Sequence, residues 1–272
     1  MRFAHNPLFI NTVILGGTPE EKIEAAAQAG FSQIELWRQD VEKAGGGVPG
    51  IIDLVSAKNL AFTDYQVLLD FDGAPDAVRQ RKCDEALVML DTAVALGATT
   101  LLTPASTADN CLAGREEEDI RWLVDEAGRR RLRVAFEAMA WSTHINNTAA
   151  AWQLVQRIDQ PNLGLVVDAF HIFARRRSVA DLAGIPMDKI FLVQLSDLAA
   201  LPAEHALVDI ARHERLLPGE GCFPLNTLLD YLAEGGYNGP LGLEVFNDQL
   251  HQRAAHDVAI EAMSALKRCC GI

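Results

Sequence analysis

Four short apolar runs in the second half of the chain each end in a side chain that carries oxygen: Val134-Ala135-Phe136-Glu137, Leu165-Val166-Val167-Asp168, Phe191-Leu192-Val193-Gln194 and Gly242-Leu243-Glu244. The runs lack the polar alternation of a half-exposed strand, and they are too short for buried helices. They are typical of strands that are buried on both faces, as in a parallel sheet covered by helices.

The same unit, a short apolar run followed by a longer amphipathic stretch, occurs eight times along the chain. The predicted strands are Phe9–Ile14, Gln33–Trp37, Ala61–Val67, Thr99–Thr103, Arg133–Glu137, Gly164–Asp168, Ile190–Leu195 and Leu241–Val245. Helices are predicted from Thr18 to Gly30 and over about 74–96, 116–130, 148–158, 225–234 and 251–267. Alternating strands and helices predict an α/β fold with right-handed crossovers. Eight strands favour a closed (β/α)8 TIM barrel, expected as a single domain over residues 1–272.

Two segments depart from this repeat. Gly45–Gly50 is predicted to be a flexible glycine-rich loop, and Asp197–Gly221 is a long connection of the kind that is often functional. The spacings Gly-x-Gly-x-x-Gly after the first strand and GxxxxGK[ST] do not occur, so neither nucleotide-binding motif is indicated.

Composition limits the partners and the compartment. The formal net charge of −13 argues against nucleic acid and anionic membranes as partners. The five cysteines are scattered without metal-site spacing, which indicates a reducing compartment. The N-terminal residues lack the apolar segment of a signal peptide, and no apolar run approaches about 20 residues. We therefore expect a cytoplasmic protein that does not span a membrane.

The oxygen-bearing residues predict a metal site. In a barrel the C-terminal ends of the strands form the active face, so Glu137, Asp168, Gln194 and Glu244 should converge there. Three buried carboxylates repel one another unless a cation compensates. An all-oxygen ligand set suits Mn²⁺, Mg²⁺ or Co²⁺ better than structural zinc, although Zn²⁺ remains possible. A single carboxylate at a strand end often only caps the next helix, but four in succession favour a site.

Other polar residues surround the predicted ligands. His171 follows Asp168 by three residues and is expected to bind substrate, as is Arg215 in the long connection. His144 is interpreted as a catalytic base, with a substrate ligand or an ordinary loop residue as alternatives. Glu35 lies within an apolar strand and points either into the barrel or into the site, where it would contact substrate.

These residues together resemble the xylose-isomerase-like TIM-barrel superfamily of sugar isomerases, epimerases and lyases, over essentially the whole chain. The resemblance implies Glu137, Asp168, Gln194 and Glu244 as metal ligands. It also implies substrate contacts for His171, from the Asp-x-x-His step, and for Arg215, from the Arg-x-x-Pro-Gly-x-Gly turn at 215–221.

Within this superfamily the chain is most similar to the bacterial 3-dehydroshikimate dehydratases. The similarity rests on five stretches, which are Phe71-Asp72-Gly73, residues 137–141, 161–165 and 168–171, and the Gln194 ligand. Those enzymes typically place a basic residue after the third strand and another before the loop histidine. Here those places hold the segment Tyr65–Asp70, which has no arginine, and Thr143. Both departures remove positive charge that would hold a substrate carboxylate.

The sequence therefore predicts a metal-dependent lyase or isomerase that acts on a small polyhydroxy ketone through an enolate, with a dehydratase favoured by resemblance. Glu137, Glu244 and His144 are the predicted catalytic groups. The alternatives are a keto-sugar or inosose isomerase or epimerase that uses the two glutamates around an enediolate, and a non-catalytic binder of a sugar acid. An abasic-site endonuclease is disfavoured by the net charge and by the few histidines at strand ends. A homo-oligomer is also expected, with Trp37 and the glycine-rich loop as candidate contacts.

Overall fold

The computed structural model describes residues 2–272 and confirms the predicted barrel. Eight parallel strands follow one another in chain order, and the eighth pairs with the first to close the sheet. The strands are β1 (Leu8–Asn11), β2 (Gln33–Trp37), β3 (Ala61–Gln66), β4 (Thr100–Pro104), β5 (Arg133–Glu137), β6 (Leu163–Asp168), β7 (Ile190–Leu195) and β8 (Leu241–Leu243).

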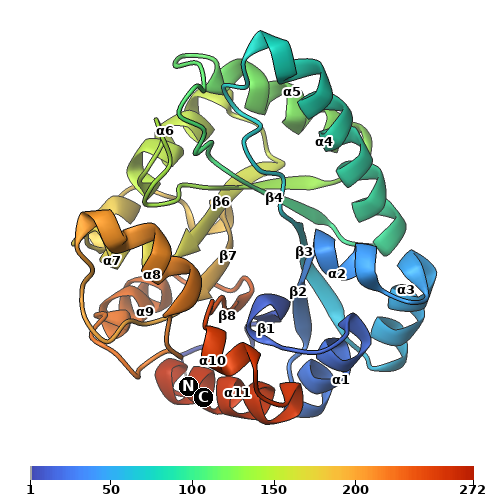
Figure 1. Cartoon of the computed structure of the whole chain (residues 1–272). Helices are drawn as coiled ribbons and strands as arrows, with labels where there is room; N and C mark the ends of the chain where they lie inside the picture. The colour runs from blue at the N-terminus through green and yellow to red at the C-terminus, as the bar shows by residue number, and fades with distance from the viewer. Residues whose placement is uncertain (1) are drawn as a thin grey trace.

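Helices surround the barrel on its outside (Figure 1). They are α1 (Pro19–Ala29), α2 (Arg38–Lys43), α3 (Gly47–Ala57), α4 (Asp76–Leu96), α5 (Glu116–Arg129), α6 (Thr148–Ile158), α7 (Ala169–Phe173), α8 (Leu207–His213), α9 (Leu225–Glu234), α10 (Asp248–His251) and α11 (Ala255–Cys270), with 3-10 turns η1 (Thr12–Ile14), η2 (Val179–Leu182), η3 (Met187–Lys189) and η4 (Glu204–Ala206). The last helix, α11, packs against α1, so the two ends of the helical ring meet.

Local signals fix several boundaries. At α1, Thr18 and Glu21 form the predicted capping box and Gly30 ends the helix at a φ of 90°. The first strand is shorter than predicted because the Asn11 side chain accepts the N–H of Val13 and starts the turn η1. The helix predicted over 251–267 is α11, which begins later, at Ala255, because the short helix α10, capped by the Asn247 side chain, ends at His251.

The prediction of a loop over Gly45–Gly50 is wrong from Gly47 onward, because α3 begins at Gly47. Pro49 lies in the first turn of α3, where a missing N–H costs no hydrogen bond. The helix is then held by contacts to α2 and α4. Tertiary packing therefore overrides the low helix propensity of the glycines.

Inside the barrel, an apolar layer lies directly below the predicted site. Side chains along a strand alternate between faces, so residues two positions before a site residue point the same way. One buried cluster occupies this level of the barrel interior. It contains the residues two positions before Asn11, Glu137, Asp168 and Gln194, which are Phe9, Ala135, Val166 and Leu192, together with Leu102. A larger apolar shell lies between the strands and the helices.

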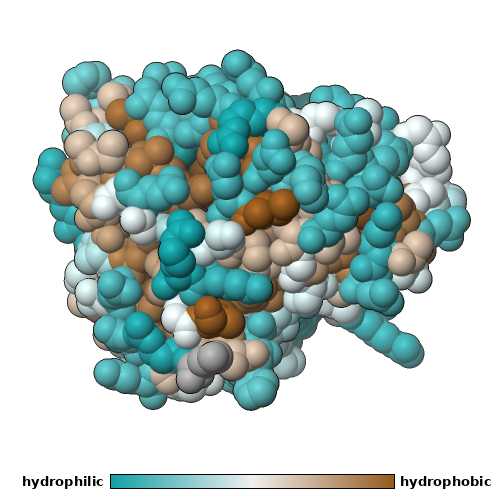
Figure 2. All heavy atoms as spheres, turned by 90° about the horizontal axis from the view of Figure 1, so that it is seen from below, coloured by the Kyte–Doolittle hydropathy of each residue, from teal (hydrophilic) through white to brown (hydrophobic). Residues whose placement is uncertain are grey.

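One face of the outer surface is seen in Figure 2. The face that carries α11 and α1 shows hydrophilic side chains with small apolar areas between them (Figure 2). None of the helices in residues 2–272 is long and apolar enough to cross a membrane.

Gly242 should be irreplaceable because of its contact with Phe9. A Cβ at this position would lie 2.2 Å from the Phe9 carbonyl oxygen and 2.4 Å from its ring. We expect Gly242→Ala to lower the free energy of unfolding by roughly 1–3 kcal/mol, measured by chemical denaturation. Gly50→Ala in α3 is the matched control, because nothing lies within 4 Å of its Cβ. It should leave stability unchanged or raise it by up to about 1 kcal/mol, and equal losses in both variants would contradict the packing argument.

Candidate active site

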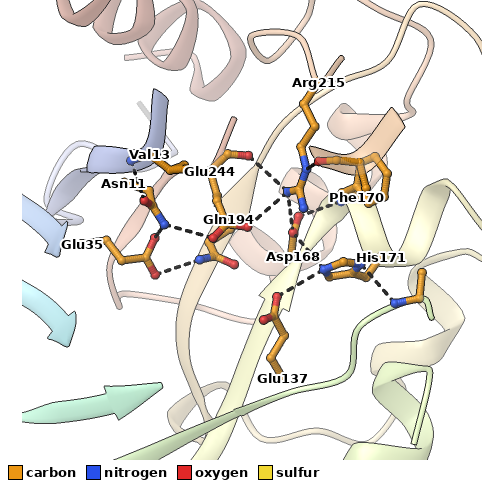
Figure 3. A network of polar contacts seen from close by, with 12 residues as sticks. Asn11, Val13, Glu35, Glu137, Asp168, Phe170, His171, Gln194, Arg215 and Glu244 are labelled. Atoms are coloured by element: carbon orange, nitrogen blue, oxygen red, sulfur yellow. Dashed lines mark hydrogen bonds and ion pairs between the residues drawn. The ribbon is translucent and has the colours of Figure 1, made fainter. Parts of the chain in front are cut away.

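The ends of β5 to β8 bring the four predicted oxygen ligands to one place (Figure 3). Asp168 and Gln194 are paired in register, and Glu137 ends the neighbouring strand β5. Glu244 follows β8 directly, and its N–H donates to the Leu195 carbonyl at 3.3 Å. All four side chains are buried.

Arg215 bridges two of these carboxylates. Its Nη1 donates to Asp168 Oδ2 at 2.9 Å and to Glu244 Oε2 at 3.2 Å, and its Nε donates to the Ala211 carbonyl. The guanidinium also lies over the Phe170 ring at 4.4 Å. The side chain is only 2% exposed, so its charge acts on the carboxylates with little screening by water.

His171 is held as a neutral donor. The Ala140 N–H donates to its Nδ1 at 3.1 Å, which places the ring proton on Nε2. That Nε2 lies 3.5 Å from both Glu137 Oε1 and Asp168 Oδ2. Burial lowers the pKa of His171 to about 4, so the ring stays neutral at physiological pH. His171 therefore presents one N–H toward the carboxylates.

A second set of polar side chains, from β1 and β2, supports the ligands. Gln194 Nε2 donates to Glu35 Oε1 at 2.7 Å, and Asn11 Nδ2 donates to Glu35 Oε2 at 2.8 Å and to Glu244 Oε1 at 3.0 Å. The Asn11 oxygen is held in turn by the indole N–H of Trp37 at 2.7 Å. Glu35 is fully buried in this set, which favours a positioning role over the expected contact with substrate.

Carboxyl groups crowd this part of the barrel. Burial, followed by the charges of Glu244 and Asp168, raises the pKa of Glu137 well above its usual value. Burial also raises the pKa of Glu244 to about 7, against the opposing effect of Arg215. Burial and neighbouring carboxyls raise the pKa values of Glu35 and Asp64 as well. The cluster therefore holds protons that a bound cation would displace.

Two buried oxygens without hydrogen-bond partners indicate whether the cluster fits a metal. Gln194 Oε1 and Glu137 Oε1 are buried and make no hydrogen bond with any of residues 2–272. The Gln194 amide is oriented so that its nitrogen binds Glu35, which leaves its oxygen for a cation. Ligand atoms of Glu137, Asp168 and His171 lie within 4.8 Å of one another. Because His171 Nε2 carries a proton in this tautomer, it suits a donor role, and the residues fit an oxygen-ligated cation.

A cavity of about 440 Å³ lies over the cluster. Trp37, Trp141 and Phe246 line it beside Glu137, His171, Arg215 and Glu244. Trp37 is partly buried there, and its indole N–H is bound to Asn11, so it is not the exposed aromatic that was expected; its role as an oligomer contact stays a prediction. The predicted base His144 is not among the lining residues of the described chain. It is exposed, with Nε2 3.2 Å from the Cys111 carbonyl oxygen.

Several residues of the site were missed in the sequence. Asn11 and Asp64 are polar residues inside apolar strands, the same signal that identified Glu35. Gln66 and Trp141 line the cavity, and the Gln66 Nε2 and Trp141 Nε1 donors are buried without a partner within residues 2–272. The cavity wall thus offers donors to an oxygen-rich ligand.

Comparisons with known proteins identify relatives of the chain. The 3-dehydroshikimate dehydratase of Pseudomonas putida is 32% identical over 259 residues, which are 94% of this chain and 40% of the relative. The chain thus spans less than half the length of that curated relative. The inosose isomerase of Halalkalibacterium halodurans is 28% identical over 127 residues, 44% of each chain.

A solved structure is also similar over nearly the whole chain. The xylose isomerase-like TIM barrel/4-hydroxyphenylpyruvate dioxygenase fusion protein superposes with a TM-score of 0.91 at 32% identity, over 98% of this chain and 43% of that one. The family model described as xylose isomerase-like TIM barrel matches residues 23–269. The chain belongs to the xylose isomerase-like TIM barrel family.

Proposed function

We propose that the chain is a divalent-metal-dependent lyase that converts 3-dehydroshikimate to protocatechuate with loss of water. The observation that carries this proposal is the pair of buried oxygens without hydrogen-bond partners, Gln194 Oε1 and Glu137 Oε1, with Glu137 and the Nε2–H of His171 lining a cavity for a small ligand. The similarity to the Pseudomonas putida dehydratase supports the substrate class.

Glu137, Asp168, Gln194 and Glu244 would hold the metal, with Mn²⁺, Mg²⁺ or Co²⁺ favoured by the oxygen ligands and Zn²⁺ possible. The cation would act as a Lewis acid toward the ketone and stabilise negative charge that develops on its oxygen. His171 would donate its Nε2–H to a substrate oxygen, which stabilises the same charge and orients the ring.

Proton transfer would fall to the cluster's own carboxyls. Glu137 and Glu244 both line the cavity. Burial raises the pKa of Glu137 above its usual value and that of Glu244 to about 7, and such raised pKa values suit groups that take up and return protons. Loss of the proton next to the ketone, followed by departure of the β-hydroxyl as water, leads to the aromatic product. His144 would need a movement of its loop to reach the substrate, so the glutamates are the preferred bases.

The isomerase alternative rests on the same two glutamates. If a proton removed by Glu137 were returned by Glu244 to another carbon, the cavity would catalyse keto-sugar or inosose isomerisation, and the Halalkalibacterium halodurans relative supports this class. A non-catalytic binder of a sugar acid would retain metal without turnover.

The remaining proposals concern the setting of the enzyme. All five cysteines are free, which supports a reducing, cytoplasmic location. A small molecule is the proposed partner, and self-association into a homo-oligomer remains a prediction.

Replacing a ligand should abolish turnover. We expect Glu137→Gln and Glu244→Gln to lower kcat/KM for 3-dehydroshikimate by at least about 100-fold, because each removes a charge that binds the cation. Protocatechuate formation is followed by ultraviolet absorbance in chelator-treated protein with Mn²⁺, Mg²⁺ or Co²⁺ restored. Glu234→Gln, at an exposed position on α9, is the control and should be fully active. Full activity without metal would contradict the proposal, and metal binding without turnover would direct the search to inososes.

Stability should depend on pH and metal together. The folded-state pKa of Glu244, raised to about 7, exceeds its unfolded value of about 4.5. Its contribution to stability is therefore present below about pH 4.5 and lost as pH rises through about 7. A divalent cation binds the deprotonated form, so the rise in Tm on adding Mn²⁺ should be larger at pH 8 than at pH 5.5. Calorimetry measures this difference. An equal rise at both pH values would refute it, and Glu244→Gln should weaken it.

A further inference from the structure

We propose that Arg212 is the specificity-determining cation of this cavity and that it receives the carboxylate of the substrate. Arg212 lies on α8, near its C-terminal end, and lines the cavity together with its neighbour Ala211. The inference rests on the proposed function and names the group that recognises the anionic end of the ligand.

Two arginines line the cavity, and they differ in their pairing. The Arg215 guanidinium is buried and bonded to Asp168 and Glu244. Arg212 is exposed, and its guanidinium makes no ion pair or hydrogen bond with other side chains or carbonyls of residues 2–272. It is therefore the lining cation whose donors are free for a ligand.

The charge balance of the cavity calls for such a cation. The three carboxylates Glu137, Asp168 and Glu244 would be balanced by Arg215 together with the proposed divalent cation. Asp70 adds a further negative group to the wall, fixed there by the Thr107 N–H at 2.9 Å. Without Arg212 the cavity would repel an anion, and the net charge of −13 on the whole chain would reinforce that repulsion.

Arg212 also supplies a positive charge that the segment after β3 does not provide. The segment after β3, which carries Leu69 and Asp70, contributes no basic side chain to the cavity. Arg212 reaches the same cavity from α8, and α8 is anchored because the Ala211 carbonyl accepts the Nε of Arg215 at 2.9 Å. The residue that bridges the carboxylates therefore also holds the turn of helix that carries Arg212.

The geometry favours a carboxylate over a phosphate. A single planar guanidinium matches the two oxygens of a carboxylate in a fork. A doubly charged phosphate is usually held by several cations or by backbone N–H groups at a glycine-rich loop or the start of a helix. Among the lining residues of the described chain, Arg212 is the one unpaired cation.

The test compares an acid with its uncharged methyl ester. Calorimetry in the presence of Mn²⁺ measures the Kd of protocatechuate and of its uncharged methyl ester, whose hydroxyls are identical. We expect the wild-type chain to prefer the acid by about tenfold, as for one charge-assisted contact. Arg212→Gln should abolish that preference and weaken apparent substrate binding in turnover, seen as a higher KM, by a similar factor with little change in kcat. Arg212→Lys should keep part of the preference for the acid and should raise KM less than Arg212→Gln does.

Arg81→Gln is the matched control, because Arg81 is an exposed arginine on α4 away from the cavity lining. It should behave as the wild type. If Arg212→Gln keeps the acid preference and leaves KM unchanged, Arg212 is not the carboxylate receptor, although the dehydratase can still stand. If 3-dehydroshikimate is not turned over but Arg212→Gln loses the acid preference, Arg212 stands and the dehydratase fails. A wild-type chain without any acid preference would overturn the inference.

Discussion

Buried negative charge is the constraint around which this barrel is arranged. Glu137, Asp168 and Glu244 lie in the interior, and the Arg215 guanidinium supplies only one compensating charge. Burial of an uncompensated carboxylate is so costly that the group takes up a proton, and the raised pKa values of Glu137 and Glu244 express that cost. A divalent cation would relieve it, because the same oxygens are its preferred ligands. Relief of this repulsion would favour the binding of a cation.

The rest of the fold holds this cluster in a fixed geometry. The apolar layer formed by Phe9, Ala135, Val166 and Leu192 lies one alternation below the site, and its packing sets the height of the side chains above it. Asn11 and Glu35 then fix the rotamers of Glu244 and Gln194 through hydrogen bonds. Support of this kind is what a metal site needs to keep its ligands oriented. Glycine at position 242 is also required for this packing, because a Cβ there would clash with the backbone and ring of Phe9.

Much of this arrangement could be predicted from the sequence, since parallel strands bring their C-terminal residues to one face. The positions of Glu137, Asp168, Gln194 and Glu244 followed from that rule alone. The hydrogen bonds from Asn11 that hold Glu35 and Glu244 could not be predicted in this way. A polar residue inside a short strand gives no local sign of which partners it contacts. The start of α3 at Gly47 was also missed, because packing against neighbouring helices decides it. Arg212 has the appearance of any exposed helical arginine until the cavity is known.

The account depends most directly on a cation held by these four residues. A crystal grown with Mn²⁺ and measured at the manganese absorption edge would locate the ion by its anomalous scattering. The account predicts one strong peak per chain, within about 2.0–2.4 Å of oxygens from Glu137, Asp168, Gln194 and Glu244. An empty cluster at saturating Mn²⁺, or a peak bound only by residues elsewhere, would contradict it.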